Sequence, residues 1–314
     1  MVNKVVDIEK ALDISGAGSI LMQPVIDKVV AQLVDYRNPL RQNLPRKPGS
    51  GSAWVLNRRT ACSTTPAAWV LDTDELHEDE GNYTQVSFYY KTLAARGKVT
   101  RKLQAVGRTY ADILADELES KVLEFKDVED KGLLIGSTTA SATSKEMQGL
   151  KWLIPESQTV VCYAGTAGGT LTLELLDEAI DLCTGEPDML IMSKKTRRLL
   201  NALLQSSQRF IDKIEVKGGF KVMSYNNIPI YTSNNVVNTQ SVGAGGTVSS
   251  EVGGSTSSIY VVDTEHTWVG VLTPVKVQPL AKTSSQFDKF DIFCDEVLVV
   301  RNYQANSKLV GIAA

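Results

Sequence analysis

The sequence predicts an α+β protein that has two structured regions and two extended ones. One segment, residues 109–132, has the apolar period of a long helix, and a later one, residues 159–262, alternates short strands with helices. At 314 residues the chain is also longer than a single core usually grows, so two domains or one elaborated domain are expected.

Composition and charge exclude several classes of protein. Hydrophobic residues make up 43% and charged residues 22% of the chain, which are ordinary values for a soluble fold. The net charge of −3 argues against a protein whose main task is to grip nucleic acid. No apolar run approaches the roughly 18 residues of a membrane span, and acids interrupt the N-terminal segment, so we expect neither membrane insertion nor secretion. The cysteines are expected to be reduced and mostly buried, as in a cytosolic protein: Cys62, Cys162, Cys183 and Cys294.

Residues 1–49 are predicted to form an arm rather than a domain. Apolar residues at helical spacing predict a short amphipathic helix over 20–36. The segment 37–52 is rich in proline and glycine and cannot form a core of its own, so it must lie across another part of the protein or stay mobile.

Residues 52–103 are predicted to form one long hairpin. The first strand is expected over 52–59 and a longer return strand over 84–103. The connection, 61–83, places an acidic tip on a basic stem, and an isolated hairpin is marginal in water, so a neighbouring copy is expected to supply the complement. A solvated loop with scattered charge is the alternative. The residues predicted to contact the neighbour are Arg58, Arg59, Asp72, Asp74, Glu75, Glu78, Lys91, Arg96 and Lys98.

The helix predicted over 109–131 is the longest element of the chain. Thr109 is a candidate N-cap, and Gly132 is expected to end the helix in the left-handed conformation. At about 1.5 Å per residue the helix would be roughly 33 Å long. Its apolar face needs a sheet to lie on, whereas its charged face suits water or a charged neighbour. The charged face comprises Asp116, Glu119, Lys121, Glu124, Lys126, Asp127, Glu129 and Asp130, of which Glu119, Lys121 and Glu124 are further candidates for contacts between subunits.

The remainder of the chain is predicted to build sheets. Within the α/β region, two short strands are expected to join through Asn226–Asn227. The low-complexity segment 243–258 is expected to be a mobile surface loop. The chain closes with strands expected over 259–262, 267–272, 275–279, 290–303 and, as an edge, 308–312.

Motifs for catalysis or metal binding are not apparent. The acidic run begins like a calcium loop at Asp72, but His77 stands where glycine is needed and Tyr83 where the bidentate glutamate belongs. The segment 263–266 places an Asp, a Glu and a His together, a composition more typical of a turn than of a catalytic triad. We therefore expect no enzyme activity, no cofactor and no metal.

The order of elements, together with four stretches of sequence, resembles a known family. The stretches are ALDISGAGSILMQPVIDKVV, EDKGLLIGS, LTLELLDEAIDLCTGEPDMLIMS and GGFKVMSYNNIPIYTSNNV. They resemble the major capsid protein of tailed bacteriophages, which has the Hong Kong phage capsid fold. The resemblance covers essentially the whole chain and is strongest over 171–236.

This resemblance implies a structural protein without a cofactor. It implies an N-terminal arm (1–49), an extended loop (50–103), a peripheral domain (104–158 with 263–314) that holds the spine helix (109–131), and an axial domain (159–262). Such subunits assemble into hexamers and pentamers of an icosahedral head that encloses double-stranded DNA. The location implied is the virion, and the host cytoplasm during assembly. Weak, sequence-independent genome contact is expected from Arg37, Arg41, Arg46 and Lys47.

Further partners follow from the same resemblance. A portal is an expected partner, together with either a separate scaffolding protein or none, and with or without decoration proteins; no membrane is expected. Some family members crosslink subunits through a lysine and an asparagine, for which Lys91 or Lys98 is a hypothesis here. An encapsulin-like bacterial compartment shell, which shares the fold, is the first alternative. A small-molecule enzyme with a glycine-rich lid is the second.

Overall fold

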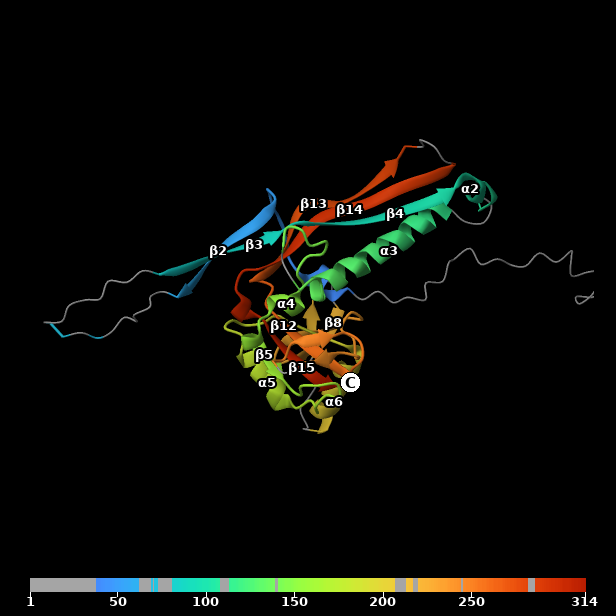
Figure 1. The fold of residues 1–314 in the computed structure, drawn as a ribbon. Helices are drawn as coiled ribbons and strands as arrows, with labels where there is room; N and C mark the ends of the chain where they lie inside the picture. The colour runs from blue at the N-terminus through green and yellow to red at the C-terminus, as the bar shows by residue number, and fades with distance from the viewer. Residues whose placement is uncertain are drawn as a thin grey trace, which may run out of the picture.

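The described part of the protein is organised around two sheets, one long helix and a projecting hairpin. The computed structural model describes residues 38–61, 69, 71–72, 81–107, 113–138, 141–206, 213–216, 220–243, 245–281 and 286–314. Figure 1 shows a body below, an elongated layer of sheet and helix that extends above it to the right, and the hairpin that projects from the level of this layer to the left. The helix predicted over 20–36 lies outside the described residues.

A seven-stranded mixed sheet forms the body. Its strand order is β5-β15-β12-β6-β9-β8-β7. The strands are β5 (Thr159–Val161), β6 (Met189–Met192), β7 (Lys213–Val216), β8 (Phe220–Tyr225), β9 (Ile228–Thr232), β12 (Thr256–Val262) and β15 (Ser307–Ala313). The sequence of β6 is a continuous apolar run because the strand is buried on both faces. The predicted Asn226–Asn227 connection between β8 and β9 is confirmed, with φ values of 47° and 62° that fit a tight hairpin turn.

Alternate residues of the body strands enter two different cores. Leu190 and Met192 face the helices α5 (Leu173–Asp181) and α6 (Lys194–Ser206). Met189 and Ile191 face the other way, toward the upper layer. This second core also takes in Leu133 and Leu134 of α3 (Ile113–Leu134), Leu150 of α4 (Leu150–Leu153), Val269 of β13 (Thr267–Leu280) and Leu298 of β14 (Phe287–Val300). It therefore binds the body to the upper layer.

The upper layer is a four-stranded sheet covered on one face by α3. Its strand order is β1-β13-β14-β4, with β1 at Arg46–Pro48 and β4 at Lys91–Thr100. Phe125 of α3 packs against Phe290 and Ile292 of β14. The smaller elements are α1 (Pro39–Asn43), α2 (Arg101–Gly107), β10 (Ser241–Val242), β11 (Val248–Ser250) and two 3-10 turns, Glu156–Gln158 and Tyr303–Ala305.

The end of α3 differs from the sequence prediction. Gly132 lies inside the helix, which continues to Leu134, and the left-handed glycine is Gly136, with φ of 49°. A Cβ on Gly136 would lie 2.4 Å from the carbonyl oxygen of Met147, so only glycine fits there. Burial of Leu133 and Leu134 in the second core accounts for the extra turn. The predicted N-cap Thr109 lies outside the described residues.

The charged face of α3 also ends earlier than predicted. Glu129 and Asp130 were expected to face water or a neighbour, but both are buried. They lie where the helix passes between the arm and the body, so neighbouring elements cover that side of its last turns.

The hairpin is shorter than predicted. β2 (Ala53–Ala61) pairs with β3 (Asn82–Tyr89) in antiparallel register. The single return strand expected over 84–103 is wrong, because the chain leaves the hairpin after Tyr89 and β4 pairs with β14 instead. The apolar side chains of β4 explain this choice, since Leu93 packs under α3 only in the upper sheet.

Two expectations for the end of the chain are also wrong. The edge strand expected over 308–312 is β15, which lies inside the body sheet between β5 and β12. The loop expected over 243–258 contains β11 and the first residues of β12, where Thr256, Ser257 and Ser258 are fully buried. The hydroxyl of Thr256 donates to the backbone carbonyl of Gln240 and that of Ser258 to the Gln240 side-chain oxygen, whereas the buried Ser257 hydroxyl has no hydrogen-bond partner among the described residues.

Candidate assembly surfaces

The root of the hairpin is fixed to the upper layer. Trp54 of β2 meets Trp268 of β13 edge to face, with ring centroids 6.0 Å apart. Arg58 donates hydrogen bonds to the backbone carbonyls of Val300 and Arg301. Burial lowers the pKa of the Arg58 guanidinium. Arg58, which the sequence suggested as a contact to a neighbour, is thus engaged in attaching the hairpin to its own subunit.

The outer part of the hairpin exposes apolar side chains as well as charges. Trp69 is fully exposed, and Leu71 and Tyr83 are mostly exposed. Arg59 is exposed and lies 5.7 Å from the ring centroid of Tyr83. Exposed aromatic and aliphatic groups of this kind mark interaction surfaces. Among the predicted acids of the tip, Asp72 is exposed, whereas Asp74, Glu75 and Glu78 lie outside the described residues.

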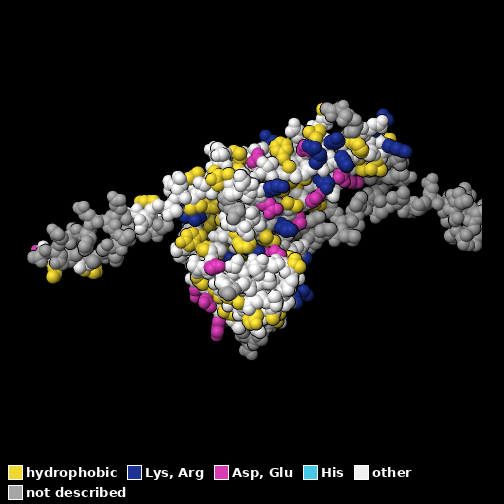
Figure 2. All heavy atoms as spheres, in the orientation of Figure 1, with side chains coloured by type: hydrophobic (Ala, Val, Ile, Leu, Met, Phe, Trp, Pro, Cys, Tyr) yellow, Lys and Arg dark blue, Asp and Glu magenta, His cyan; other side chains and the backbone are white. Residues whose placement is uncertain are grey.

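The charged candidates of the upper layer lie on two separate faces. On α3, Lys121 pairs with Glu124 at 2.7 Å, and Glu119 is exposed on the same helix. On the sheet face turned away from α3, Arg96 makes a bidentate pair with Asp291 at 2.6 and 2.7 Å. We call Lys121–Glu124 and Arg96–Asp291 the surface pairs. Figure 2 shows basic and acidic side chains interspersed over this part of the molecule.

The two lysines considered for a crosslink have different surroundings. Lys91 donates to the backbone carbonyls of Ser141, Ala142 and Ser144, at 2.8, 3.1 and 2.5 Å, so it holds that loop in place. Lys98 is exposed, and its ammonium lies 5.7 Å from the ring centroid of Phe287. Lys98 is therefore the more accessible of the two.

A cluster of charges with buried carboxylates and partly exposed arginines, which we call the arm junction, joins residues 38–48 to α3 and β14. It consists of Arg41, Arg46, Glu129, Asp130 and Glu296. Arg41 donates to Glu129 at 2.6 Å, and Arg46 donates both to Glu129 and, at 3.3 Å, to Glu296. Asp130 accepts the backbone N–H of Arg41 at 3.2 Å. Two of the bases expected to face a genome are thus ion-paired inside the subunit.

Burial changes the acidity of this cluster. It raises the pKa of Asp130 to about 6, although hydrogen bonds from Asn235 and Ser233 oppose the shift. Burial, followed by the charge of Glu129, raises the pKa of Glu296 to about 7. The other two bases suggested for genome contact are Lys47, whose ammonium lies 3.6 Å from the ring centroid of Trp268, and Arg37, which is outside the described residues.

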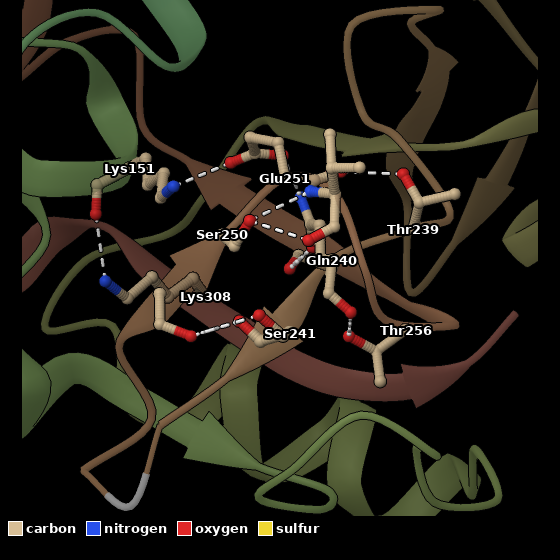
Figure 3. A network of polar contacts seen from close by, with 11 residues as sticks. Lys151, Thr239, Gln240, Ser241, Ser250, Glu251, Thr256 and Lys308 are labelled. Atoms are coloured by element: carbon tan, nitrogen blue, oxygen red, sulfur yellow. Dashed lines mark hydrogen bonds and ion pairs between the residues drawn. The ribbon is translucent and has the colours of Figure 1, made fainter.

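A second polar network holds the segment 239–256 against the body (Figure 3). Lys151 donates to Glu251 at 2.6 Å, and Gln240 donates to the other oxygen of that carboxylate at 3.0 Å. Lys308 donates to the backbone carbonyls of Lys151 and Ile154. Burial, followed by the charge of Lys151, lowers the pKa of Lys308 to about 8. Sequence reasoning missed this network, although a lysine inside the apolar run 307–313 was a signal.

The structure places the Asp, Glu and His side chains that the sequence groups at 263–266 in a turn between two strands. The predicted turn at 263–266 is confirmed: Asp263 accepts from the backbone N–H of Glu265 at 2.7 Å and lies 2.8 Å from His266 Nδ1. Within the described ranges, no group of three or more His, Cys, Asp or Glu side chains has a metal-binding arrangement. Among the helices that the structure describes, none has the length and hydrophobicity of a membrane span.

The fold is shared with viral and bacterial shells. The capsid of an empty GTA particle matches with a TM-score of 0.70 and 14% identity, over 97% of this chain and 100% of that one. The Mycobacterium phage Bobi matches with a TM-score of 0.66 and 13% identity, over 96% and 98%. The holo-SrpI encapsulin complex from Synechococcus elongatus PCC 7942 matches with a TM-score of 0.67 and 12% identity, over 95% of both chains. At such low identities these matches concern the fold.

The assignment to a family rests on the sequence and not on the fold match. No curated protein matches the chain significantly. The profile of the SU10 major capsid protein family, however, matches residues 20–313, which is nearly the whole chain. The match agrees with the resemblance drawn from the order of elements, and it includes the hairpin, the long helix and both sheets. This chain belongs to the SU10 major capsid protein family, and it is a capsid subunit with the Hong Kong phage capsid fold.

Proposed function

We propose that copies of this chain form hexamers and pentamers that close into an icosahedral shell around double-stranded DNA. The observation that carries the proposal is the hairpin. β2 and β3 pair only with each other among the described strands, and the outer part exposes Trp69 and Leu71. An isolated hairpin with exposed apolar groups is marginal in water. A neighbouring copy supplies the missing surface, and every subunit repeats the contact in a closed assembly.

We propose that the hairpin of one copy lies on the upper layer of a neighbouring copy. The surface pairs and Glu119 present both signs of charge there, and Arg59 offers a complementary cation on the hairpin. We retain the division into an arm (1–49), an extended loop, a peripheral domain and an axial domain (159–262) as part of this proposal. Because β4 pairs with β14, we draw the end of the extended loop at Tyr89 instead of residue 103.

Genome contact is proposed to be weak and independent of sequence. The net charge of −3 and the pairing of Arg41 and Arg46 with buried acids leave few cations for phosphates. The subunit is proposed to act structurally, without catalysis or a cofactor. It assembles in the host cytoplasm with portal, scaffolding and decoration proteins as further partners.

Electron microscopy and sedimentation of the purified protein test this proposal. Closed particles are expected, together with hexamer- and pentamer-sized species in sedimentation. A strictly monomeric profile across salt and protein concentration would contradict it.

A bacterial compartment shell is the second candidate, supported by the fold match to the SrpI encapsulin. The contents of particles recovered from the natural host separate the two. Packaged DNA supports a phage head, and a protein cargo supports a compartment.

A further inference from the structure

A cavity lies between β4, the last turns of α3 and the loop that follows the helix. Its volume is about 260 Å³. This is far more than the roughly 10–15 Å³ that holds one water, and slightly below the ~300–1,000 Å³ of sites for drug-sized ligands. A small molecule or a single side chain is therefore the size of occupant that it suits. The walls are largely apolar and include Leu93, Val128, Ile135 and Met147.

The buried end of this cavity carries an incompletely paired carboxylate. Glu296 lines the cavity and is only 1% exposed. Its Oε2 accepts from Arg46 at 3.3 Å, but no described donor lies within hydrogen-bonding distance of Oε1. Glu129 lines the cavity too, but each of its oxygens already accepts from an arginine. Glu296 Oε1 is therefore the acceptor that remains open to an occupant.

None of the lysines that line the cavity donates a hydrogen bond to Glu296 Oε1. Lys91 uses its ammonium on three backbone carbonyls. Lys131, Lys145 and Glu146 are exposed. These three exposed residues mark the mouth of the cavity. A cation that reaches Glu296 must therefore enter past them, and the chain that carries it must lie along the apolar walls.

We propose that this cavity binds a primary alkylammonium group, whose ammonium donates to Glu296 Oε1 and whose alkyl chain packs against Leu93, Val128 and Met147. An aliphatic chain with a single terminal charge matches both the walls and the buried end. A divalent cation matches less well, because Ca²⁺ and Mg²⁺ need about six oxygen ligands and the walls are apolar. The group can belong to a free aliphatic amine or to a lysine of a second copy of this chain.

Binding is expected to depend on pH through Glu296. Burial raises the pKa of this carboxyl to about 7, and a bound ammonium favours its ionised form. Affinity should therefore rise about tenfold between pH 6 and pH 8, as the ionised fraction of the free site rises. The charged and titratable groups around Glu296 are Glu129 of α3, Arg41 of α1, Arg46 of β1, Lys91 of β4, Lys131, Lys145 and Glu146 at the mouth, and Cys294 and Asp295 of its own strand.

The experiment is calorimetric titration of the purified unassembled protein with n-pentylamine, with 1-pentanol as the uncharged probe. The amine should bind, more tightly at pH 8 than at pH 6, and the alcohol should bind more weakly. Glu296→Gln should weaken amine binding at least about tenfold. Val128→Trp, at the mouth, should abolish it with Glu296 intact. Asp291→Asn is the matched control, because Asp291 lies on the same strand outside the cavity.

Several outcomes would overturn the proposal. They are no amine binding, equal binding by amine and alcohol, unchanged binding by a folded Glu296→Gln protein, or binding that appears only after Lys131→Ala or Lys145→Ala. The last would mean that the chain's own lysine fills the site.

Pentylamine binding to assembled shells distinguishes the two possible sources of the amine. If a neighbour's lysine is the natural occupant, pentylamine should bind the unassembled protein but not the shell, and Glu296→Gln should slow shell formation. If the occupant is a free amine, both forms should bind it. The first titration does not require shells, so its result stands even if the assembly proposal fails.

Discussion

The arm junction and the surface pairs are made of the same residue types and differ mainly in burial. In the arm junction, the carboxylates of Glu129 and Glu296 are almost inaccessible to water. The carboxylates of the surface pairs, Asp291 and Glu124, are instead 23% and 55% exposed. Removing one partner from a buried pair leaves an uncompensated charge in a poorly polarisable environment, whereas an exposed partner is simply hydrated. Burial thus decides whether a charge serves the subunit's own fold or is available to a neighbour.

The largest effect is expected from Glu129→Ala. This change leaves Arg41 and Arg46 without their shared carboxylate, so the free energy of unfolding should fall by about 3–5 kcal/mol. Urea denaturation followed by circular dichroism measures it, with Glu124→Ala as the exposed acid on the same helix. A loss below about 1 kcal/mol would show that the junction is not a buried pair in solution.

The second effect is a pH dependence that arises from Asp130 and Glu296. Their pKa values, about 6 and about 7, lie above the ordinary carboxyl range, so between pH 4 and 7 the folded state binds more protons than the unfolded state. These groups therefore lower stability as pH rises through that window, each on the order of 2–3 kcal/mol.

Denaturation at pH 5 and pH 8 tests this dependence. Asp130→Asn should lose less stability between the two pH values than the wild type does. A variant that loses as much as the wild type would exclude Asp130 as a source.

The third test distinguishes the roles of Arg58 and Arg59, the two neighbouring arginines of β2. Arg58→Ala removes two charge-assisted hydrogen bonds to backbone carbonyls, and should cost about 1–3 kcal/mol of subunit stability. Arg59→Glu should leave the free energy of unfolding unchanged and impair shell formation, because Arg59 is exposed. Denaturation and electron microscopy of both variants measure the two effects. Normal shells from Arg59→Glu at low and high salt would remove this residue from the interface.

The smallest effect on the subunit is expected from the surface pairs. Lys121→Ala should change the free energy of unfolding by no more than about 0.5 kcal/mol, and Arg96→Ala should not shift the denaturation curve measurably. Either variant should weaken assembly most at low salt, where exposed charges are least screened. Assembly rates measured by light scattering check this, and a salt-independent defect would point to packing instead of charge.

Local pattern was enough to predict several parts of this protein. The apolar period of α3, the run Met189–Met192 and the Asn226–Asn227 turn all appear where expected, because short-range spacing and backbone preference specify them. The order of such elements was also sufficient to recognise the capsid fold. The amphipathic pattern of α3 could not show that Glu129 and Asp130 are buried, because other elements cover its last turns.

The sequence by itself therefore determined the helices, strands and turns that local pattern specifies, such as α3, β6 and the Asn226–Asn227 turn, and the family to which the order of elements belongs. Only the tertiary structure decided what their side chains do. Arg58 and Arg59 are adjacent in sequence, yet one is held by the carbonyls of Val300 and Arg301, more than 240 residues away, and the other is exposed. β4 pairs with β14 instead of extending the hairpin, because α3 covers the apolar face of β4 in the upper sheet. The physical reason is that burial and long-range pairing depend on which distant elements meet, and one-dimensional spacing does not contain that information.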